Sequence, residues 1–325
     1  MSGRLPRRAR ACRSTIPLAL PVVAVMALAG FMAVPPAPDV VPGPAVVAAG
    51  RGVTGRDFVY TVAAGDTLTR IGAQLGVEPR ELARQNGLPR TARLRIGQGL
   101  RVDNQHVIPG GISDGLVLNI PQRMVFLLRD GRLERAYPAA VGRSASKWQT
   151  PIRAFRISAK DVDPTWVVPA AIQKEMEEAG KPVETRVPPG PDNPLGAYRL
   201  RLAGVDWAIH GTNAPASIYT FQTHGCVRLE PADIEDLFAR VQVGDPVTFL
   251  YAPVLLAVGP DGAVLLEAQP DVYNRKIDFA AIVDQAAQVL GVTSRLDPAR
   301  VRQVLAERAG IARRVDRQED SPERE

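Results

Sequence analysis

The amino-acid sequence predicts a mainly β domain that is preceded by a small βααβ module and followed by a short helical extension. Three observations lead to this fold class. Short strand-like runs follow one another closely over residues 116–251, with few helical patterns between them. Residues 58–103 show the order strand, helix, helix, strand. Residues 252–325 combine one strand-like hairpin with two amphipathic helical patterns.

Length and charge limit the possible functions. The chain has 325 residues, which is enough for roughly two domains of ordinary size. Its formal charge is +6, but five arginines lie within the first thirteen residues and no acidic residue precedes Asp39. The rest of the chain is therefore almost neutral. Nucleic-acid binding needs a basic face or stripe, so we exclude nucleic acid as a partner.

The N-terminal segment has the features of a secretory signal. Its arginines are followed by an uncharged apolar run over residues 16–34, in which Ala27 and Ala29 form an A-x-A cleavage motif. We predict a signal peptide over residues 1–29 and an exported protein of the periplasm or cell envelope. The alternative is an uncleaved membrane anchor, because the run is nearly long enough to span a bilayer. Residues 30–57 are rich in Pro, Ala, Gly and Val and predict an extended linker.

The βααβ module over residues 58–103 begins and ends with a strand-like run. After the first run, Asp66 or Thr67 can cap a helix that Gly76 ends, and Pro79 opens a second helix. The segments YTVAAGDTL and IGQGLRV resemble a LysM domain, the module that binds the N-acetylglucosamine chains of peptidoglycan and chitin. The resemblance implies that this module binds the glycan of peptidoglycan.

The domain over residues 116–251 is predicted to consist mainly of short strands. Asp130 and Gly131 form a turn between two of them, and AFRISA, YRLRLAG, WAIHGT and PVTFLY are further β-rich runs. Helical patterns interrupt the strands at residues 170–179 and 231–241. Their expected apolar faces are Ile172, Met176 and Ala179 in the first helix, and Ile234, Leu237, Phe238 and Val241 in the second.

The helical extension follows a strand-like hairpin that begins at residue 254. Its two helices are predicted over residues 277–290 and 297–309, each ended by a glycine. We expect the helices to pack on the β domain as a lid or a spacer.

His210 and Cys226 can form a nucleophilic pair. Cleavage of the signal would remove Cys12 and leave Cys226 as the chain's single cysteine. A thiol is mostly protonated near neutral pH and needs a base beside it, which a histidine supplies. His210 ends a predicted strand and Cys226 follows a loop sixteen residues later, so the fold can bring the two side chains together.

The neighbours of Cys226 are residue types that assist such chemistry. Gly225 permits an unusual backbone angle and a close approach of substrate. The backbone N–H groups of Gly225 and Cys226 can face a developing oxyanion. Arg228 shares the face of Cys226 in an extended segment and can hold a substrate carboxylate.

These residues also have other interpretations than a nucleophilic site. Cys226 can be a buried, inert thiol. His210, His224 and Cys226 can be three ligands of a zinc ion. His224 can be a structural histidine bonded to the backbone, and Arg228 can form a surface ion pair with Glu230.

The stretch IHGTNAPASIYTFQTHGCVRL is similar to the signature of L,D-transpeptidases, in which a histidine and a spacer precede Ser/Thr-His-Gly-Cys. The likeness extends over residues 116–268 and implies a β-sandwich-like catalytic fold. It implies that Cys226 is the nucleophile and His210 the general base, with the carbonyl of Gly211 orienting the imidazole. It further implies that an oxyanion pocket is shaped by Thr223, His224 and Gly225, that Arg228 contacts the substrate, and that no metal or organic cofactor is needed.

Two residues depart from the family pattern. Arg153 stands where relatives usually have a glycine, and Tyr219 replaces a small residue in the loop before the signature. We expect both side chains to narrow the cleft and to affect the choice of acceptor.

The two resemblances together imply an exported peptidoglycan L,D-transpeptidase. Cys226 would attack the third residue of a stem tetrapeptide and expel the terminal D-Ala. An amine of a second stem or of a protein would capture the acyl group, forming a 3→3 cross-link or a protein attachment. The alternatives are a hydrolase or L,D-carboxypeptidase, in which water captures the acyl group, and a non-enzymatic wall-binding protein. A membrane is a partner only if the N-terminal segment is retained.

Overall fold

The computed structural model describes residues 47–317. The predicted signal peptide, Cys12 and most of the predicted linker lie outside these residues. Among the helices described, none is long and apolar enough to cross a membrane.

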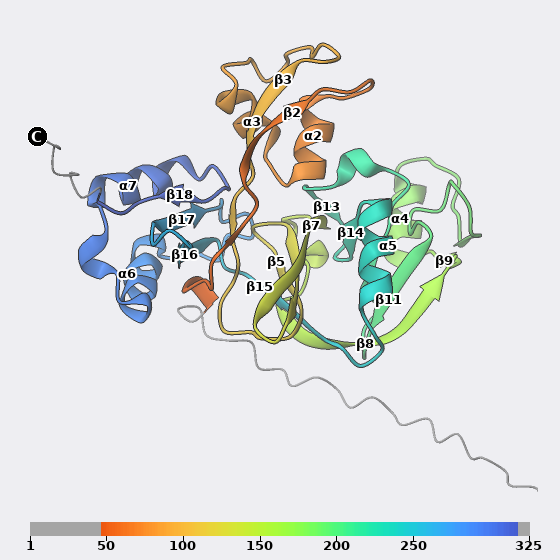
Figure 1. Cartoon of the computed structure of the whole chain (residues 1–325). Coiled ribbons are helices and arrows are strands. Elements are labelled where there is room, and N and C mark those ends of the chain that lie inside the picture. Colours follow the sequence, from red (N-terminus) through yellow and green to blue (C-terminus); the bar gives the residue numbers. More distant parts are fainter. Residues whose placement is uncertain (1–46, 318–325) are drawn as a thin grey trace, which may run out of the picture. The chain divides into compact units, whose positions relative to one another are not determined.

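The βααβ module is formed by two strands and two helices, as the sequence predicts (Figure 1). Strands β2 (Asp57–Thr61) and β3 (Gly99–Asp103) pair antiparallel, and α2 (Leu68–Leu75) and α3 (Pro79–Gln85) connect them. The Thr67 side chain caps α2 by accepting a hydrogen bond from the Arg70 N–H. The core of the module consists of Val62, Leu68, Ile71, Val77, Leu82, Ala83, Leu100 and Val102.

One nine-stranded sheet forms the β domain. In spatial order its strands are β13, β7, β14, β12, β11, β8, β15, β5 and β6. Because β7 also pairs with β6, the sheet closes on itself around a core that includes Phe155, Ile209 and Phe249. The bounds are β5 (Gly115–Asn119), β6 (Met124–Arg129), β7 (Arg132–Gly142), β8 (Arg153–Val162), β11 (Tyr198–Leu202), β12 (Ala208–His210), β13 (Phe221–Thr223), β14 (Val227–Leu229) and β15 (Pro246–Leu250).

Helix α5 (Pro231–Arg240) packs on this sheet through Ile234 and Leu237, which belong to the same core. In the described part of the chain, three short 3₁₀ turns lie in the loops: η1 (Ser146–Trp148), η2 (Pro215–Ser217) and η3 (Thr293–Arg295).

Between β8 and β11 the chain leaves the sheet and forms a flap, residues 163–197. The flap contains β9 (Trp166–Val167), α4 (Ala170–Glu178) and β10 (Arg186–Val187), and its two strands pair antiparallel. The expected apolar face of α4 is not buried: Ile172 and Met176 are half-buried and Ala179 is exposed. The helix borders an open cleft, which Ile172 lines, so it has no core to pack against.

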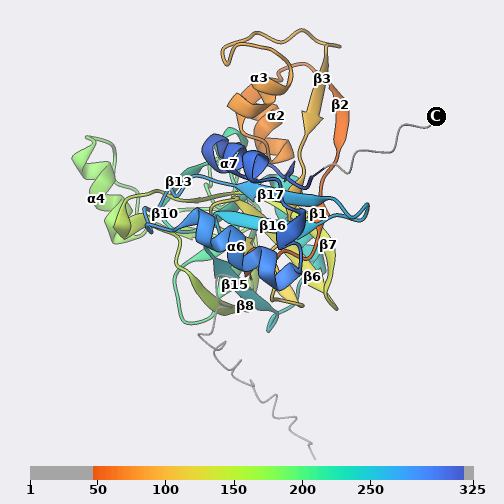
Figure 2. The same cartoon turned by 90° about the vertical axis from the view of Figure 1, so that its left-hand side faces the viewer.

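The helical extension builds a small sheet of its own. This sheet comprises β16 (Val254–Val258), β17 (Val264–Ala268) and β18 (Arg313–Arg314). Helix α6 (Phe279–Leu290) contacts β16 and α7 (Pro298–Glu307) contacts β17 (Figure 2). Successive side chains of a strand point to opposite faces. Leu256 and Leu266 therefore pack under the helices, while Leu255 packs against the β domain.

Two expectations about the extension are wrong. The helices form a core with their own sheet instead of lying on the β domain as a lid, because one face of the β16–β17 hairpin is already apolar. Helix α7 ends at Arg308, which is in the left-handed region with φ of 46°, and not at a glycine. The guanidinium of Arg308 lies over the ring of Phe279, 4.5 Å from its centre, which offsets the cost of this backbone angle.

A buried carboxylate joins the module, the β domain and the extension. The short strands β1 (Val53–Thr54) and β4 (His106–Val107) pair with each other; β1 leads the chain into the module, and β4 leads it from the module to the β domain. His106 Nδ1 lies 3.0 Å from Glu267 Oε1, and both side chains are only 1% exposed. His106 Nε2 lies 2.8 Å from the carbonyl oxygen of Gly76. Since both ring nitrogens face acceptors, both carry a proton and His106 is an imidazolium.

The second oxygen of Glu267 is also satisfied. Glu267 Oε2 accepts hydrogen bonds from the Val107 N–H at 2.7 Å and from Gln122 Nε2 at 2.8 Å. Three further ion pairs connect the module with the rest: buried Arg123 pairs with Glu78, and Arg313 lies 2.6 Å from both Glu81 Oε1 and Asp103 Oδ2. The module is therefore held by charged contacts to both neighbouring parts.

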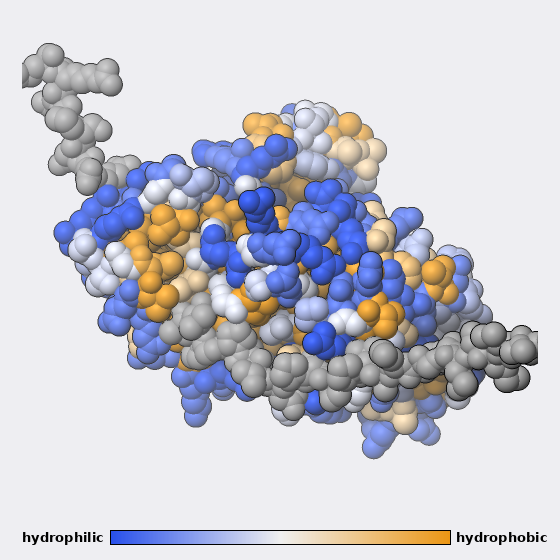
Figure 3. Space-filling model, turned by 60° about the horizontal axis from the view of Figure 1, so that its bottom comes forward, coloured by the Kyte–Doolittle hydropathy of each residue, from blue (hydrophilic) through white to orange (hydrophobic). Residues whose placement is uncertain are grey.

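The surface shown in Figure 3 carries both hydrophobic and hydrophilic residues. Hydrophobic residues form separate patches among hydrophilic ones on this face of the molecule. The large hydrophobic side chains that are most exposed among residues 47–317 are Val59, Ile96, Val162, Val167, Val183, Val243 and Val289.

The pKa of His106 makes the stability of this junction depend on pH. Burial by itself lowers the pKa, but the charge and hydrogen bond of Glu267, with the Gly76 carbonyl, raise it above the ordinary value. A raised pKa in the folded state means that the contribution to stability is complete below about pH 6.5, the value for an unperturbed histidine. The contribution is lost as the pH rises through the folded-state pKa.

We predict that Glu267→Gln lowers the free energy of unfolding by about 3–5 kcal/mol at pH 6, because it leaves a buried imidazolium without its counter-charge. Urea denaturation measures this loss. The matched control is Asp57→Asn, which breaks an exposed ion pair with Arg101 and should change little. The difference between parent and Glu267→Gln should shrink as the pH rises to 10. Equal losses in the two variants would contradict the prediction.

Candidate active site

A cleft of about 260 Å³ lies between the flap and the ends of β12 and β14. The apolar part of its lining includes Trp148, Trp166 and Trp207. The polar residues of the lining are Asp206, His210, Thr223, His224, Cys226 and Arg228. The structure therefore brings the residues singled out in the sequence into one cavity.

The parallel pairing of β12 and β14 explains this convergence. Ile209 lies opposite Val227, and His210 lies opposite Arg228. Cys226 immediately precedes β14, so this register puts it level with Ala208, which is two residues before His210 and on the same face of β12. The intervening loop returns the chain to a neighbouring strand, which puts residues distant in sequence side by side.

His210 is held in one tautomer. Its ring is 4% exposed, and Nδ1 lies 2.7 Å from the carbonyl oxygen of Gly211. A carbonyl only accepts, so Nδ1 carries the proton and Nε2 keeps its lone pair. Burial lowers the pKa of His210 to about 4, and the positive charge of Arg228 acts in the same direction, while the Gly211 carbonyl opposes it. At neutral pH His210 is a neutral base.

Cys226 is a protonated thiol in the resting state. It is the free cysteine of residues 47–317 and is partly exposed in the cleft. Burial raises the pKa of its thiol, and the backbone of Ala208 and the charge of Arg228 oppose this only in part. Such a thiol needs a base to become a nucleophile.

Arg228 does not pair with Glu230 within the part of the chain that the structure describes. Its Nε is buried and makes no hydrogen bond there. Burial lowers the pKa of Arg228, because the charged form loses its hydration. An uncompensated guanidinium in a cleft is suited to bind an anionic group.

His224 is bonded to a carboxylate and not to the backbone, contrary to the alternative that we considered. Its Nε2 lies 2.7 Å from Glu175 Oε2 on α4, and Arg143 contacts both side chains. The ring of Trp148 meets the His224 ring edge-on, with centroids 4.5 Å apart. Glu175 thus ties the flap to the residue two positions before Cys226. The hydrogen bond from His224 lowers the pKa of Glu175, and Arg143 adds to this.

Gly225 is required by its surroundings. Its φ is 107°, and a Cβ there would lie 2.7 Å from Trp207 Nε1. The Gly225 N–H, which we expected to face an oxyanion, donates instead to Thr223 Oγ1 at 3.1 Å. Thr223 Oγ1 in turn donates to the carbonyl of Cys226 at 2.6 Å. Thr223 therefore holds the turn that contains Cys226 through hydrogen bonds to its backbone.

Two residues that no sequence motif indicated also support this turn. Thr150 Oγ1 donates to the Gly225 carbonyl at 3.0 Å. Tyr273, from the extension, accepts a hydrogen bond from the Thr150 N–H at 3.1 Å and donates to the Gly142 carbonyl at 2.8 Å. They become recognisable only when the strands are placed, because neither lies near Cys226 in the sequence. Glu175 lacked a sequence signal for the same reason.

The expectation that Arg153 and Tyr219 narrow the cleft is wrong. Tyr219 is 3% exposed and packs in a core cluster, with the guanidinium of Arg123 4.1 Å from its ring centre. Arg153 opens β8 opposite Phe249, with its guanidinium 5.9 Å from the ring of Phe155. Neither residue lines the cleft.

The zinc alternative is also wrong. Within residues 47–317 no three His, Cys, Asp or Glu side chains are arranged to hold a metal ion. His224 is turned toward Glu175, so His210, His224 and Cys226 do not converge on one point.

Comparison with known proteins identifies two families. The model of the L,D-transpeptidase catalytic domain matches residues 113–249, and the model of the LysM domain matches residues 60–103. Both resemblances seen in the sequence are thereby confirmed.

Similar proteins carry the same family name. YbiS of Escherichia coli K12, described as a probable L,D-transpeptidase, is 31% identical over 234 residues, which cover 71% of this chain and 76% of YbiS. YcfS of the same strain, described in the same way, is 30% identical over 238 residues, covering 70% of this chain and 74% of YcfS. The crystal structure of L,D-transpeptidase 3 from Mycobacterium tuberculosis aligns at 18% identity with a TM-score of 0.33, covering 62% of this chain and 94% of that one. At this TM-score the structural likeness adds nothing to the sequence relationship.

The raised pKa of Cys226 predicts slow alkylation at neutral pH. In a Cys12→Ser background, iodoacetamide should modify Cys226 at a rate that still rises above about pH 8.5, the value for an unperturbed thiol. Intact-mass spectrometry at a series of pH values measures the rate. A rate that is already constant at pH 7 would show a stable thiolate and would contradict the assignment of a resting thiol.

The contact between Glu175 and His224 predicts that Glu175→Ala loosens the flap. We expect faster hydrogen–deuterium exchange in residues 163–197, since α4 has no buried side chain to hold it. Glu178→Ala is the matched control, because Glu178 lies on the same helix in an exposed pair with Lys174. If both variants exchange like the parent, the contact does not hold the flap.

Proposed function

The chain belongs to the L,D-transpeptidase family, and we propose that it is an exported enzyme that cross-links the stem peptides of peptidoglycan through a cysteinyl acyl-enzyme. The observation that carries this proposal is the tautomer of His210. With Nδ1–H bound to the Gly211 carbonyl, the free lone pair of Nε2 belongs to the cleft that also contains the Cys226 thiol.

In the first half-reaction Cys226 attacks the carbonyl carbon of the third residue of a stem tetrapeptide. The thiol proton passes to Nε2 of His210 as the carbon–sulfur bond forms, and a tetrahedral oxyanion results. The bond to the terminal D-Ala then breaks, and His210 returns its proton to the departing amine. The product is a thioester on Cys226, and free D-Ala leaves.

In the second half-reaction an amine attacks the thioester. His210 takes the proton of the amine, the new amide bond forms, and the proton returns to the departing sulfur of Cys226. A side-chain amine of a second stem peptide gives a 3→3 cross-link, and an amine of a protein gives an attachment. The atoms and protons balance without any cofactor.

The charges of the cleft support this sequence of steps. Cys226 and His210 are both uncharged at rest, so negative charge appears only during the reaction, on the sulfur of Cys226 and on the carbonyl oxygen of the substrate. Arg228 lies opposite His210 on β14, and its guanidinium has no internal counter-charge among the described residues. We assign Arg228 to binding the substrate, where it also stabilises the developing negative charge.

The walls of the cleft favour an amine over water as the second reactant. Trp148, Trp166 and Trp207, with Ile172 from the flap, surround the reactive residues with apolar surface. Such a cavity excludes water from a thioester when the substrate fills it. The LysM domain supports a peptidoglycan substrate, and by binding glycan it would raise the local concentration of stem peptides.

Incubation of the purified protein with tetrapeptide muropeptides tests the proposal. Mass spectrometry should find a dimer that is lighter than its two parents by one free alanine. Cys226→Ala should reduce its formation by at least about 10³-fold, because the covalent route is lost. Tripeptide without dimer would identify a hydrolase, and an unchanged mixture would support a wall-binding protein without activity.

A further inference from the structure

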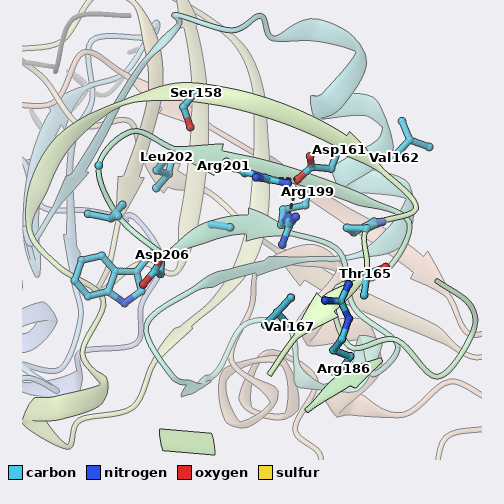
Figure 4. Close-up of a pocket in the computed structure, with 15 residues that line it drawn as sticks. Ser158, Asp161, Val162, Thr165, Val167, Arg186, Arg199, Arg201, Leu202 and Asp206 are labelled. Carbon is cyan, nitrogen blue, oxygen red and sulfur yellow. Dashed lines mark hydrogen bonds and ion pairs between the residues drawn. The ribbon is translucent and has the colours of Figure 1, made fainter. Parts of the chain in front are cut away.

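A second cavity, of about 680 Å³, lies beside the cleft (Figure 4). It is bounded by β8 and β11 of the sheet and by the flap strands β9 and β10. Asp206 and Trp207 line both cavities, so the two adjoin at these residues. We call it the arginine pocket, because Arg186, Arg199 and Arg201 line it.

The arginines of this pocket are only partly neutralised. Arg199 and Arg201 lie two residues apart on β11 and point to the same face. The Nε of each donates to the same atom, Oδ2 of Asp161, at 2.7 Å. One carboxylate balances one guanidinium, and within residues 47–317 the Nη atoms of both arginines make no hydrogen bond.

Arg186 reaches into the same space from the flap. Figure 4 shows its guanidinium extending toward Arg199, across the pocket from β11. Arg186 has no ion pair or hydrogen bond through its side chain in the described part of the chain. The other acidic residue of the lining, Asp206, lies apart from these arginines in the same view. The pocket therefore has an excess of positive charge between the flap and the sheet.

We propose that the arginine pocket binds a carboxylate group of a peptide ligand. A guanidinium offers two parallel N–H donors that match the two oxygens of a carboxylate. The Nη groups of Arg199 and Arg201, with the guanidinium of Arg186, supply several such donors around one space. The proposal rests on the proposed function, because stem peptides carry free carboxylates and have to reach Cys226 next to this pocket.

A carboxylate bound in the arginine pocket would also change the pKa of His210. Arg199 lies opposite His210 in the β11–β12 pair. Its positive charge is one of the causes that lower the pKa of His210, after burial and the charge of Arg228. A carboxylate bound at Arg199 offsets this charge and moves the pKa of His210 back toward its ordinary value. Binding in the pocket and proton transfer in the cleft are thus linked through one strand pair.

A binding cycle tests the proposal in a Cys226→Ala background of the full chain, where no reaction occurs. Calorimetry measures the dissociation constants of two peptides. One is a stem tetrapeptide whose C-terminal and internal carboxylates are free, and the other is the same peptide with these carboxylates amidated. Each peptide is titrated into the parent, into Arg186→Ala/Arg201→Ala, and into Arg132→Ala. Arg132 is an exposed arginine at the start of β7, outside both cavities, and serves as the matched control.

We expect amidation to weaken binding by about tenfold in the parent and in Arg132→Ala, as for the loss of a charge-assisted pair. In Arg186→Ala/Arg201→Ala amidation should make less than about a twofold difference, since two of the three guanidinium groups around the carboxylate are gone and Arg199 remains paired with Asp161. An undiminished effect of amidation in the double variant would show that Arg186 and Arg201 do not bind the carboxylate and would overturn the proposal. Circular dichroism confirms that each variant is folded.

Competition with free acetate shows whether the arginine pocket binds peptides or binds small anions in general. Acetate should compete only weakly, and only against the peptide with free carboxylates. Arginine-dependent binding of acetate together with no effect of peptide amidation would mean a small-anion site and would overturn the proposal. If muropeptides are never turned over but the arginine-dependent effect of amidation persists, the pocket stands while the proposed function fails.

Discussion

The parallel pairing of β12 with β14 is the constraint on which the site depends. It puts His210 beside Arg228 and puts Cys226 level with Ala208, on the same face as His210. A parallel pair needs a connection that returns to the starting end, and here that connection is the loop that contains the Thr-His-Gly turn. The turn keeps its shape because Gly225 accepts a φ of 107° and because Thr150 and Thr223 bind its backbone. The geometry of the reactive residues is thus a property of the sheet.

The reactive residues are individually unfavourable where they lie. Burial opposes the charged forms of both His210 and Cys226, and Arg228 has a buried Nε that lacks a hydrogen bond among the described residues. Such groups persist in a folded protein only when the surrounding structure is stable enough to hold them. That stability comes from the closed sheet and its apolar core, which includes Phe155 and Phe249. In the proposed mechanism, the same features that cost stability prepare the site to receive charge.

A second buried group, Glu267, connects three parts of the chain through hydrogen bonds. It lies in the extension, yet its carboxylate binds His106 between the LysM domain and the catalytic domain, and Gln122 within the catalytic domain. The extension also supplies Tyr273, which binds Thr150 behind the active-site turn. The C-terminal residues therefore support both the junction and the site, although they lie outside the matched catalytic domain. On the other side, the flap has no buried residue in α4 and is tied to the site by Glu175.

The sequence by itself determined the mainly β fold, the βααβ module and the His–Cys pair. Local patterns carry this information: alternation and turn residues define strands, Thr67 and Gly76 bound a helix, and the signature around Cys226 is contiguous. Only the tertiary structure decided what surrounds each reactive group. Glu175, Thr150 and Tyr273 are far from Cys226 in the sequence, and Tyr219 is near it yet points into a core. Side-chain partners depend on which strands meet and which face is covered, and these are long-range properties that no local pattern records.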